Sequence, residues 1–168
     1  PADVRIETYV RAKTMEAIEA THKKVDTALK AGGDAVGAQT VIATMPGQLP
    51  LACNNRLNEL FVTNAKIAEP NVAVKDAGHF SASTDMGDVS HLLPVIHPFI
   101  GGVDGFLHTA DFHVVDFKHA VLLPAKAFAM MIIDLLADDA ELARQIKTEH
   151  HPLLTKEEYI AKLDKYFQ

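Results

Sequence analysis

Cysteine is nearly absent from this chain of 168 residues, and positively charged residues are fewer than negatively charged ones. The single cysteine, Cys53, excludes a disulfide framework within the chain and gives no reason to place the protein in an oxidising compartment. Lys and Arg total 16 against 22 Asp and Glu, which gives a net charge of -6 with no basic run. Nucleic-acid binding is therefore not expected, because phosphate contacts need clustered positive charge.

Segments that would mark a membrane or secreted protein are also lacking. The longest apolar stretch, residues 118–137, is interrupted by charged residues such as Lys126 and Asp134. A buried helix packed on a sheet is therefore a better interpretation than a membrane helix. The first residues contain no basic segment followed by an apolar one, so no signal peptide is predicted. A cytoplasmic protein that does not bind membranes is expected.

Several catalytic motifs do not occur. There is no His-Glu-x-x-His, no Gly-x-Ser-x-Gly and no glycine-rich run ending in Lys. Cys53 has only Arg56 as a basic neighbour, which favours a core or loop thiol over a nucleophile. The only Glu-Glu pair, Glu157 and Glu158, falls in the first turn of a predicted helix, where exposed carboxylates are ordinary.

The composition that is present is that of a globular protein, with 48% hydrophobic residues. Apolar and polar residues alternate over 4–11, which predicts a strand with one buried face. Apolar residues at steps of three and four then predict a helix over 15–31, capped by Thr14 and ended by Gly32-Gly33. The β-branched run 39–45 predicts a second strand. This strand–helix–strand unit is too small to be stable alone, so we expect a larger sheet.

A change of character near residue 50 predicts a domain boundary between residues 1–50 and 51–168. Pro46-Gly47 and Pro50 mark the connection. Asn54 or Asn55 is placed to cap the helix that follows.

Further elements are predicted along the second segment. Residues 92–100 are at best a short buried strand, because they contain two prolines. The apolar helix over 118–137 is followed by a short helix near 139–148. Thr155 and Glu158 have the spacing of a capping box for the last helix.

Histidine is unusually frequent, with nine in the chain. Five of them lie close to aspartates, and imidazole with carboxylate is the ligand set that Zn²⁺ prefers. Taken singly each histidine is ordinary, and the spacing is not that of a one-helix zinc motif. A self-contained zinc site of His91, His97 and His108 is one interpretation. The five are His79, His91, His97, His108 and His113, near Asp85, Asp88, Asp104 and Asp111.

Small residues and a glycine make 83–88 a candidate ligand loop, since such loops let the backbone approach a ligand closely. The alternative is a helix N-terminus in which Ser83 or Thr84 is the cap and Asp85 complements the helix dipole. Local sequence leaves both interpretations open.

Three blocks occur together: Ser-Thr-Asp-Met-Gly-Asp-Val-Ser-His at 83–91, Pro-Val-Ile-His-Pro at 94–98, and Leu-His-Thr at 107–109. Their order, followed by a long apolar helix, resembles the C-terminal catalytic half of the aminoacylase and carboxypeptidase G superfamily of metal-dependent amidohydrolases. The resemblance is nearest to its aminobenzoyl-glutamate hydrolase and β-alanyl-lysine dipeptidase branch. Residues 1–50 resemble the end of the family's lid, or dimerisation, domain.

The resemblance implies an α/β fold. Residues 51–168 would form the C-terminal part of a mixed-sheet zinc-peptidase catalytic domain, preceded over 1–50 by a strand–helix–strand remnant of an α+β lid domain. It also implies a homodimer that hydrolyses an amide bond in an N-acyl amino acid or dipeptide. Two divalent ions would activate the water; Zn²⁺ is favoured by imidazole ligation, and Mn²⁺ or Co²⁺ suit such sites too.

The resemblance also assigns site residues. His108 matches the family's last metal ligand. Ser83, Thr84, Asp85 and Gly87 match the residues that line the substrate pocket near the metals.

The family's general base and other metal ligands do not occur here. The chain has no His-x-Asp or Cys-x-His pair, and its Glu-Glu pair lies on the wrong helix. A zinc site needs about three protein ligands, so one histidine is not enough. We therefore expect this chain, which begins with Pro1, to be the C-terminal part of a longer enzyme. It would be inactive without the N-terminal part.

A missing partner surface predicts an exposed apolar sheet edge or helix face. The alternative function is a non-catalytic α/β association module that pairs through the predicted strand 4–11 and helix 15–31.

Overall fold

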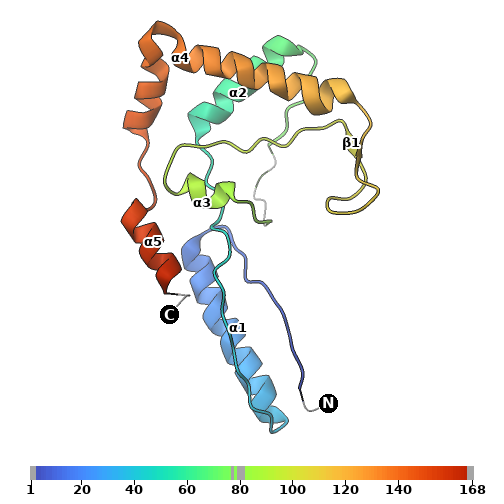
Figure 1. Ribbon diagram of the computed structural model, residues 1–168, viewed down its shortest axis with the longest axis vertical. Coiled ribbons are helices and arrows are strands. Elements are labelled where there is room, and N and C mark those ends of the chain that lie inside the picture. Colours follow the sequence, from blue (N-terminus) through green and yellow to red (C-terminus); the bar gives the residue numbers. More distant parts are fainter. Residues whose placement is uncertain (1–2, 77, 79–81, 166–168) are drawn as a thin grey trace. The chain divides into compact units, whose positions relative to one another are not determined.

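The computed structural model describes residues 3–76, 78 and 82–165, and helix is its main secondary structure (Figure 1). The chain divides into two compact units, and each is described by itself. The first comprises Pro1–Leu51, Ala77–His91 and Leu154–Gln168, and the second comprises Ala52–Asp76 and Leu92–Leu153. A border after Leu51 lies next to the predicted boundary, but two later segments join the first unit. The assignment of 1–50 to a lid and 51–168 to a catalytic domain stays a prediction.

The first unit begins with α1 (Met15–Ala35). Its predicted cap is confirmed, because the Thr14 hydroxyl accepts a 3.3 Å hydrogen bond from the Ala17 N–H. The predicted end is wrong, since the helix runs through Gly32-Gly33 to Ala35. A helix tolerates glycine at a cost of about 1 kcal/mol. The left-handed conformation appears only at Gly37, with φ 71°.

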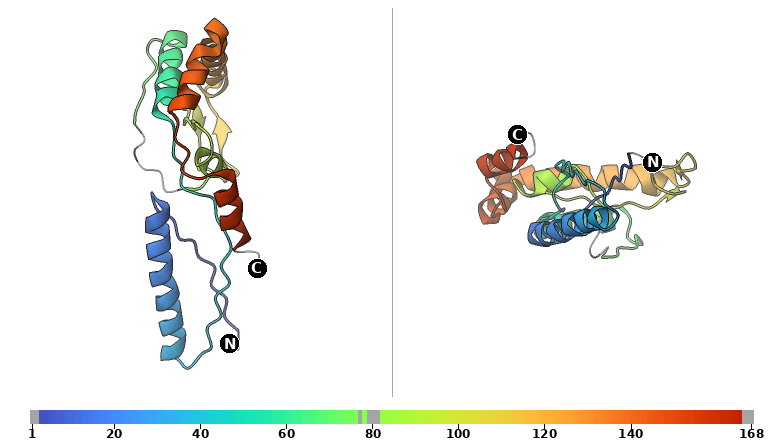
Figure 2. Two further views of the ribbon diagram at one scale, coloured as in Figure 1. Left: turned by 90° about the vertical axis from the view of Figure 1, so that its left-hand side faces the viewer. Right: turned by 90° about the horizontal axis from the view of Figure 1, so that it is seen from below.

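The predicted strands at 4–11 and 39–45 are wrong. Both segments run along α1 as irregular chain (Figures 1 and 2). Val4 and Ile6 are 70% and 71% exposed. A strand needs a neighbour for its hydrogen-bond ladder, and in the described part of this unit no such neighbour is present. The larger sheet that these segments were expected to join remains a prediction.

Two short helices complete the first unit: α3 (Met86–Ser90) and α5 (Lys156–Asp164). The predicted capping box of α5 is confirmed. The Thr155 hydroxyl accepts from the Glu158 N–H at 3.2 Å, and the Glu158 carboxylate accepts from the Thr155 N–H at 2.7 Å. Because both bonds lie within one turn, the sequence alone was enough to find them.

The second unit is built on the contact of α2 (Asn55–Ala68) with α4 (Leu123–Glu149). Asn54, one of the two residues predicted as caps, is the N-cap of α2 and accepts from the Leu57 N–H at 3.1 Å. The Phe61 and Phe128 rings lie 4.9 Å apart between their centroids. Six buried residues form the core: Leu57, Phe61, Ala65, Ala127, Met131 and Ile146.

α4 is interrupted within its length, as Figure 1 shows. Asp138, Asp139 and Ala140 adopt positive φ angles between 49° and 58°. This left-handed turn separates an apolar helix from a polar one, so the predicted end near 137 is confirmed. The polar part is anchored to α2 through an ion pair of Arg56 with Glu149 at 2.5 Å.

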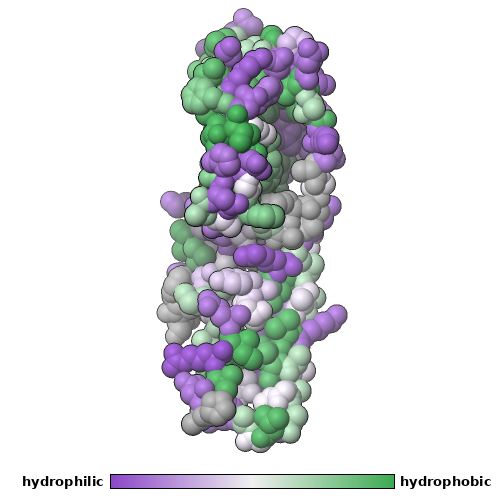
Figure 3. Space-filling model, turned by 90° about the vertical axis from the view of Figure 1, so that its right-hand side faces the viewer, coloured by the Kyte–Doolittle hydropathy of each residue, from purple (hydrophilic) through white to green (hydrophobic). Residues whose placement is uncertain are grey.

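The apolar part of α4 is buried on one side only. Leu123, Ala127 and Met131 are covered, whereas Ile133 and Leu136 are 66% and 63% exposed. Figure 3 shows one face of the molecule, on which hydrophobic side chains reach the surface in several patches. The expected exposed apolar helix face is therefore confirmed, but the sheet expected to cover this helix is not part of the described chain.

Length and hydropathy alone would allow the helical stretch Lys118–Glu149 to cross a membrane, and little of it is buried. It includes the π-helical turn η1 (Lys118–Leu122), which precedes α4. Core helices of other proteins share this length and hydropathy, so the predicted absence of membrane binding stays a prediction.

The remaining element is a small hairpin. β1 (Val103–Asp104) pairs antiparallel with β2 (His113–Val114), and Val103 lies opposite Val114. These are the strands found in the described residues. Residues 92–100 form no strand, although Val95 is buried and its carbonyl accepts from the Asn54 N–H at 2.8 Å.

Candidate functional site

The predicted substrate-lining residues lie at the start of α3. Ser83 and Thr84 precede the helix, Asp85 is its N-cap, and Gly87 is in its first turn. The Gly87 N–H donates to the Thr84 carbonyl at 2.8 Å. The alternative of a helix N-terminus at 83–88 is therefore confirmed, but the cap is Asp85 and not Ser83 or Thr84.

One face of α3 carries three polar side chains at intervals of three residues, which we call the α3 clasp. Each one is hydrogen-bonded to a different residue of the connection 48–50 that leads out of the first unit. The Asp85 carboxylate accepts from Gln48 Nε2 at 2.8 Å, Asp88 accepts from the Leu49 N–H at 3.3 Å, and His91 Nε2 donates to the Pro50 carbonyl at 2.9 Å.

Gly87 makes this close contact possible. A Cβ at this position would lie 1.9 Å from the Leu49 carbonyl oxygen, so a larger residue would push the two segments apart. The glycine was expected to bring backbone close to a ligand. In the structure it brings α3 close to the connection instead.

Asp88 lies at the centre of the clasp. Partial burial raises the pKa of its carboxyl, and the hydrogen bond from Leu49 and the nearby His91 oppose that effect. Burial, followed by the charge of the nearby Asp88 carboxylate and hydrogen bonding to it, raises the pKa of Tyr159 in α5. The segment that leads into α5 is also bound to the end of α3, because the Leu154 N–H donates to the His91 carbonyl at 3.0 Å.

His108, the predicted metal ligand, belongs to the second unit and lies in the loop of the hairpin. The Thr109 N–H donates to the Phe106 carbonyl at 3.2 Å, which closes a four-residue turn. His108 is the third residue of this turn and has a φ of 65°. Type II turns require a positive φ there and normally use Gly or Asn.

Thr109 secures this turn with its side chain. Its hydroxyl is bonded to the Phe106 carbonyl and to the Asp111 carboxylate. The imidazole of His108 is exposed to solvent. A histidine held in a left-handed conformation costs about 1 kcal/mol that glycine would avoid. Strain of this kind is a reason to consider a functional role.

The other histidines have separate surroundings. His91 is engaged with Pro50, the His97 ring packs edge-on against Phe99, and His113 Nδ1 donates to the Asp111 carbonyl at 2.6 Å. His79 lies outside the described residues.

Across residues 3–76, 78 and 82–165, no three His, Cys, Asp or Glu side chains are arranged to hold a metal ion. His91 belongs to the first unit and His97 and His108 to the second, so the self-contained site of these three residues stays a prediction. Since a zinc site needs about three protein ligands, the residues present do not fit a complete metal centre. His108 is exposed and available as one ligand at most.

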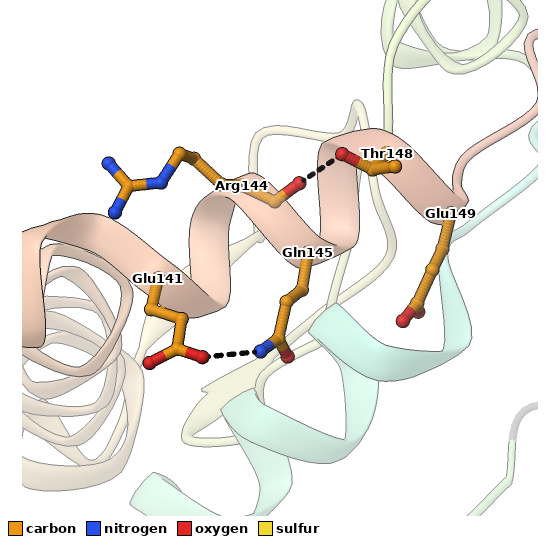
Figure 4. A pocket seen from close by; sticks show the side chains of 5 residues that line it. All are labelled: Glu141, Arg144, Gln145, Thr148 and Glu149. Carbon is orange, nitrogen blue, oxygen red and sulfur yellow. Dashed lines mark hydrogen bonds between the residues drawn. The ribbon is translucent and has the colours of Figure 1, made fainter.

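A surface hollow lies along the polar part of α4, lined by five side chains (Figure 4). Gln145 donates to Glu141 at 3.0 Å, and the Thr148 hydroxyl donates to the Arg144 carbonyl at 2.9 Å. These partners lie on one exposed helix face and satisfy one another, so the hollow has no feature of a binding site. The lining residues are Glu141, Arg144, Gln145, Thr148 and Glu149.

The sequence analysis did not predict the α3 clasp, although it singled out the three residues that form it. The residue types of Asp85, Asp88 and His91 indicate metal binding. Their spacing of three was the available signal for a shared helix face. Their partners lie about 40 residues away in sequence, and no local pattern reveals such contacts.

Comparisons with known proteins give one informative match. No family model matches this chain, and no solved structure does. The chain is 30% identical over 142 residues to the Xaa-Arg dipeptidase of Mus musculus, a match that includes 80% of this chain and 33% of that protein. The chain thus spans a third of the length of the curated relative that it matches. It is similar to a peptidase, which agrees in broad terms with the resemblance to dipeptidases and amidohydrolases.

Proposed function

We propose that this chain is the C-terminal part of a metal-dependent hydrolase that cleaves an amide bond in a dipeptide or an N-acyl amino acid. The observation that carries this proposal is the similarity to a dipeptidase. A match over 80% of the chain necessarily includes its middle, and therefore both the 83–91 block and His108.

His108 is the residue that we assign to a metal ion. The exposed imidazole and the strained turn that holds it support this role. Two divalent ions, Zn²⁺ or else Mn²⁺ or Co²⁺, would supply the activated water in the complete enzyme. Because the described residues do not fit a complete centre, the other ligands and the general base are assigned to an N-terminal part.

Ser83, Thr84, Asp85 and Gly87 are assigned to the substrate pocket. The relative's name identifies dipeptides ending in arginine as its substrates, so a dipeptide with a basic second residue is the first compound to test. An acidic chain with a net charge of -6 suits such a substrate.

The exposed apolar face of α4 supports the proposal that a second polypeptide surface packs against this helix. Ile132, Ile133 and Leu136 are each more than half exposed. We assign this face to contact with the N-terminal part of the enzyme. Formation of the homodimer is assigned to the complete enzyme. The alternative of a non-catalytic association module draws on the same exposed surface, but its predicted pairing strand at 4–11 does not form.

The proposal is tested with the full-length gene product. Xaa-Arg dipeptides, other dipeptides and N-acyl amino acids are offered as substrates with each metal ion, and bound metal is measured. Hydrolysis that is lost together with metal in His108→Ala supports the proposal. Unchanged hydrolysis and metal content in that variant would overturn it, and a protein that hydrolyses none of these compounds would favour the association module.

A further inference from the structure

The α3 clasp lies where the chain passes between its two compact units. The chain leaves the first unit after Leu51 and after His91, and it returns at Ala77 and at Leu154. The clasp is hydrogen-bonded at three of these four passages: to the connection 48–50, at His91 itself, and to Leu154, whose N–H donates to the His91 carbonyl at 3.0 Å. Three segments that are far apart in sequence are therefore bound together at one place within the first unit.

Asp88 is the middle residue of this arrangement. Its carboxylate accepts from the Leu49 N–H at 3.3 Å and lies near Tyr159, so it stands between the connection and α5. Asp85 and His91 are the charged or titratable groups on either side of it. Asp85 and His91 each make one hydrogen bond with the connection 48–50.

The backbone around Asp88 leaves little freedom. Gly87 touches the Leu49 carbonyl so closely that no Cβ fits. Ser90 is 1% exposed, and its hydroxyl donates to the Gly87 carbonyl at 2.5 Å. A shift of the connection would thus move the turn Thr84–Gly87, which the bond from the Gly87 N–H to the Thr84 carbonyl closes.

We propose that Asp88 is a positioning residue, which holds the segment Ser83–Gly87 in its substrate-lining place through its hydrogen bond with the Leu49 N–H, near Tyr159 of α5. This inference rests on the proposed function. Asp88 itself contacts no substrate in this scheme, and its effect passes through the connection and α3.

The test measures hydrogen exchange of the peptide containing Leu49 and the hydrolysis kinetics of the same full-length samples. Asp88→Ala removes the acceptor, so exchange at Leu49 should become about tenfold faster. KM should rise about tenfold while kcat and metal content stay near wild type. Asp88→Asn keeps a carbonyl oxygen for the Leu49 N–H and should restore both values.

Asp34→Ala is the matched control, because Asp34 is exposed in the same unit. It should change neither exchange nor KM. Tyr159→Phe removes one hydroxyl and should raise exchange at Leu49 in the same direction, which provides a milder variant should Asp88→Ala fail to fold.

Unchanged exchange at Leu49 in both Asp88→Ala and Tyr159→Phe would contradict the assigned role of Asp88 in the clasp, whether or not the protein has hydrolytic activity. Faster exchange with unchanged KM would reduce Asp88 to a structural role and overturn the positioning proposal. A wild-type protein without hydrolytic activity would instead contradict the proposed function, and the exchange experiment would still report on the clasp.

Discussion

The side-chain amide of Asn64 donates a 2.7 Å hydrogen bond to the carboxylate of Asp134, which joins α2 to α4. Asn64 is 1% exposed and also donates to the Leu60 carbonyl at 3.1 Å. A buried amide with both N–H groups satisfied fixes how the two helices align, because a shift along either axis would leave it unpaired.

Asn64→Ala should lower the free energy of unfolding by about 2 kcal/mol, since it removes two hydrogen bonds and leaves a small cavity. Urea denaturation measures the change. Asp134→Asn keeps an acceptor oxygen and should cost much less. Equal losses in the two variants would contradict the assigned role of the Asn64 amide.

The α5 capping box gives a local prediction. Thr155→Ala should destabilise α5 by about 1 kcal/mol, because the Glu158 N–H loses its acceptor. Hydrogen exchange of the peptides covering α5 is the measurement. Glu157→Gln changes a neighbouring first-turn carboxylate without a capping bond and serves as the control. Thr155→Ala with exchange like that of Glu157→Gln would count against the box.

The same box predicts a response to acid. The hydrogen bond from the Thr155 N–H lowers the pKa of Glu158. A carboxyl whose pKa is lowered by folding stabilises the folded state above its ordinary pKa, and this contribution is lost as pH falls through the lowered pKa. Exchange in α5 should therefore rise on acidification in the wild type, and the rise should be smaller in Glu158→Gln.

Asp88 should show the opposite dependence. Burial raises its pKa, so the folded state holds the proton more firmly than the unfolded state does. Its contribution to stability is full below the ordinary carboxyl pKa of about 4 and decreases as pH rises through the raised value. Asp88→Asn is neutral throughout, so the wild type should lose stability relative to this variant over that interval. Parallel stability curves for the two proteins would disprove the burial effect.

The exposed face of α4 predicts self-association of the isolated 168-residue chain. Ile133→Ser changes an exposed side chain and should alter the unfolding free energy by less than about 0.5 kcal/mol. It should nevertheless reduce the average mass measured by light scattering. A wild-type chain that is monomeric at all concentrations would contradict a docking role for this face.

Local features of the fold were predictable from the sequence. Thr14, Asn54 and Thr155 cap helices as predicted, because each cap depends on residues within one turn. The break in α4 near 137 was visible as a change from apolar to polar residues. Features that depend on a distant partner were not predictable. The segments 4–11 and 39–45 have strand-like sequences, but a strand exists only where another strand pairs with it.

The candidate site shows the same division. The residue types at 83–88 and 108 indicated places of interest, whereas their geometry came from the structure. The sequence predicted that Gly87 lets the backbone approach a ligand, whereas Gly87 contacts the Leu49 carbonyl. The positive φ of His108 is set by the turn that Thr109 closes. Residue types reveal possible chemistry, and only long-range contacts decide which of them are free to perform it.

The most direct test of the functional role of His108 is the variant His108→Gly in the full-length protein. Glycine adopts a φ of 65° without strain, so the folded state should be as stable as wild type or more stable by about 1 kcal/mol. Without the imidazole, we predict that bound metal and dipeptide hydrolysis are both lost. A stable His108→Gly protein that still binds metal and hydrolyses dipeptides at the wild-type rate would contradict the account.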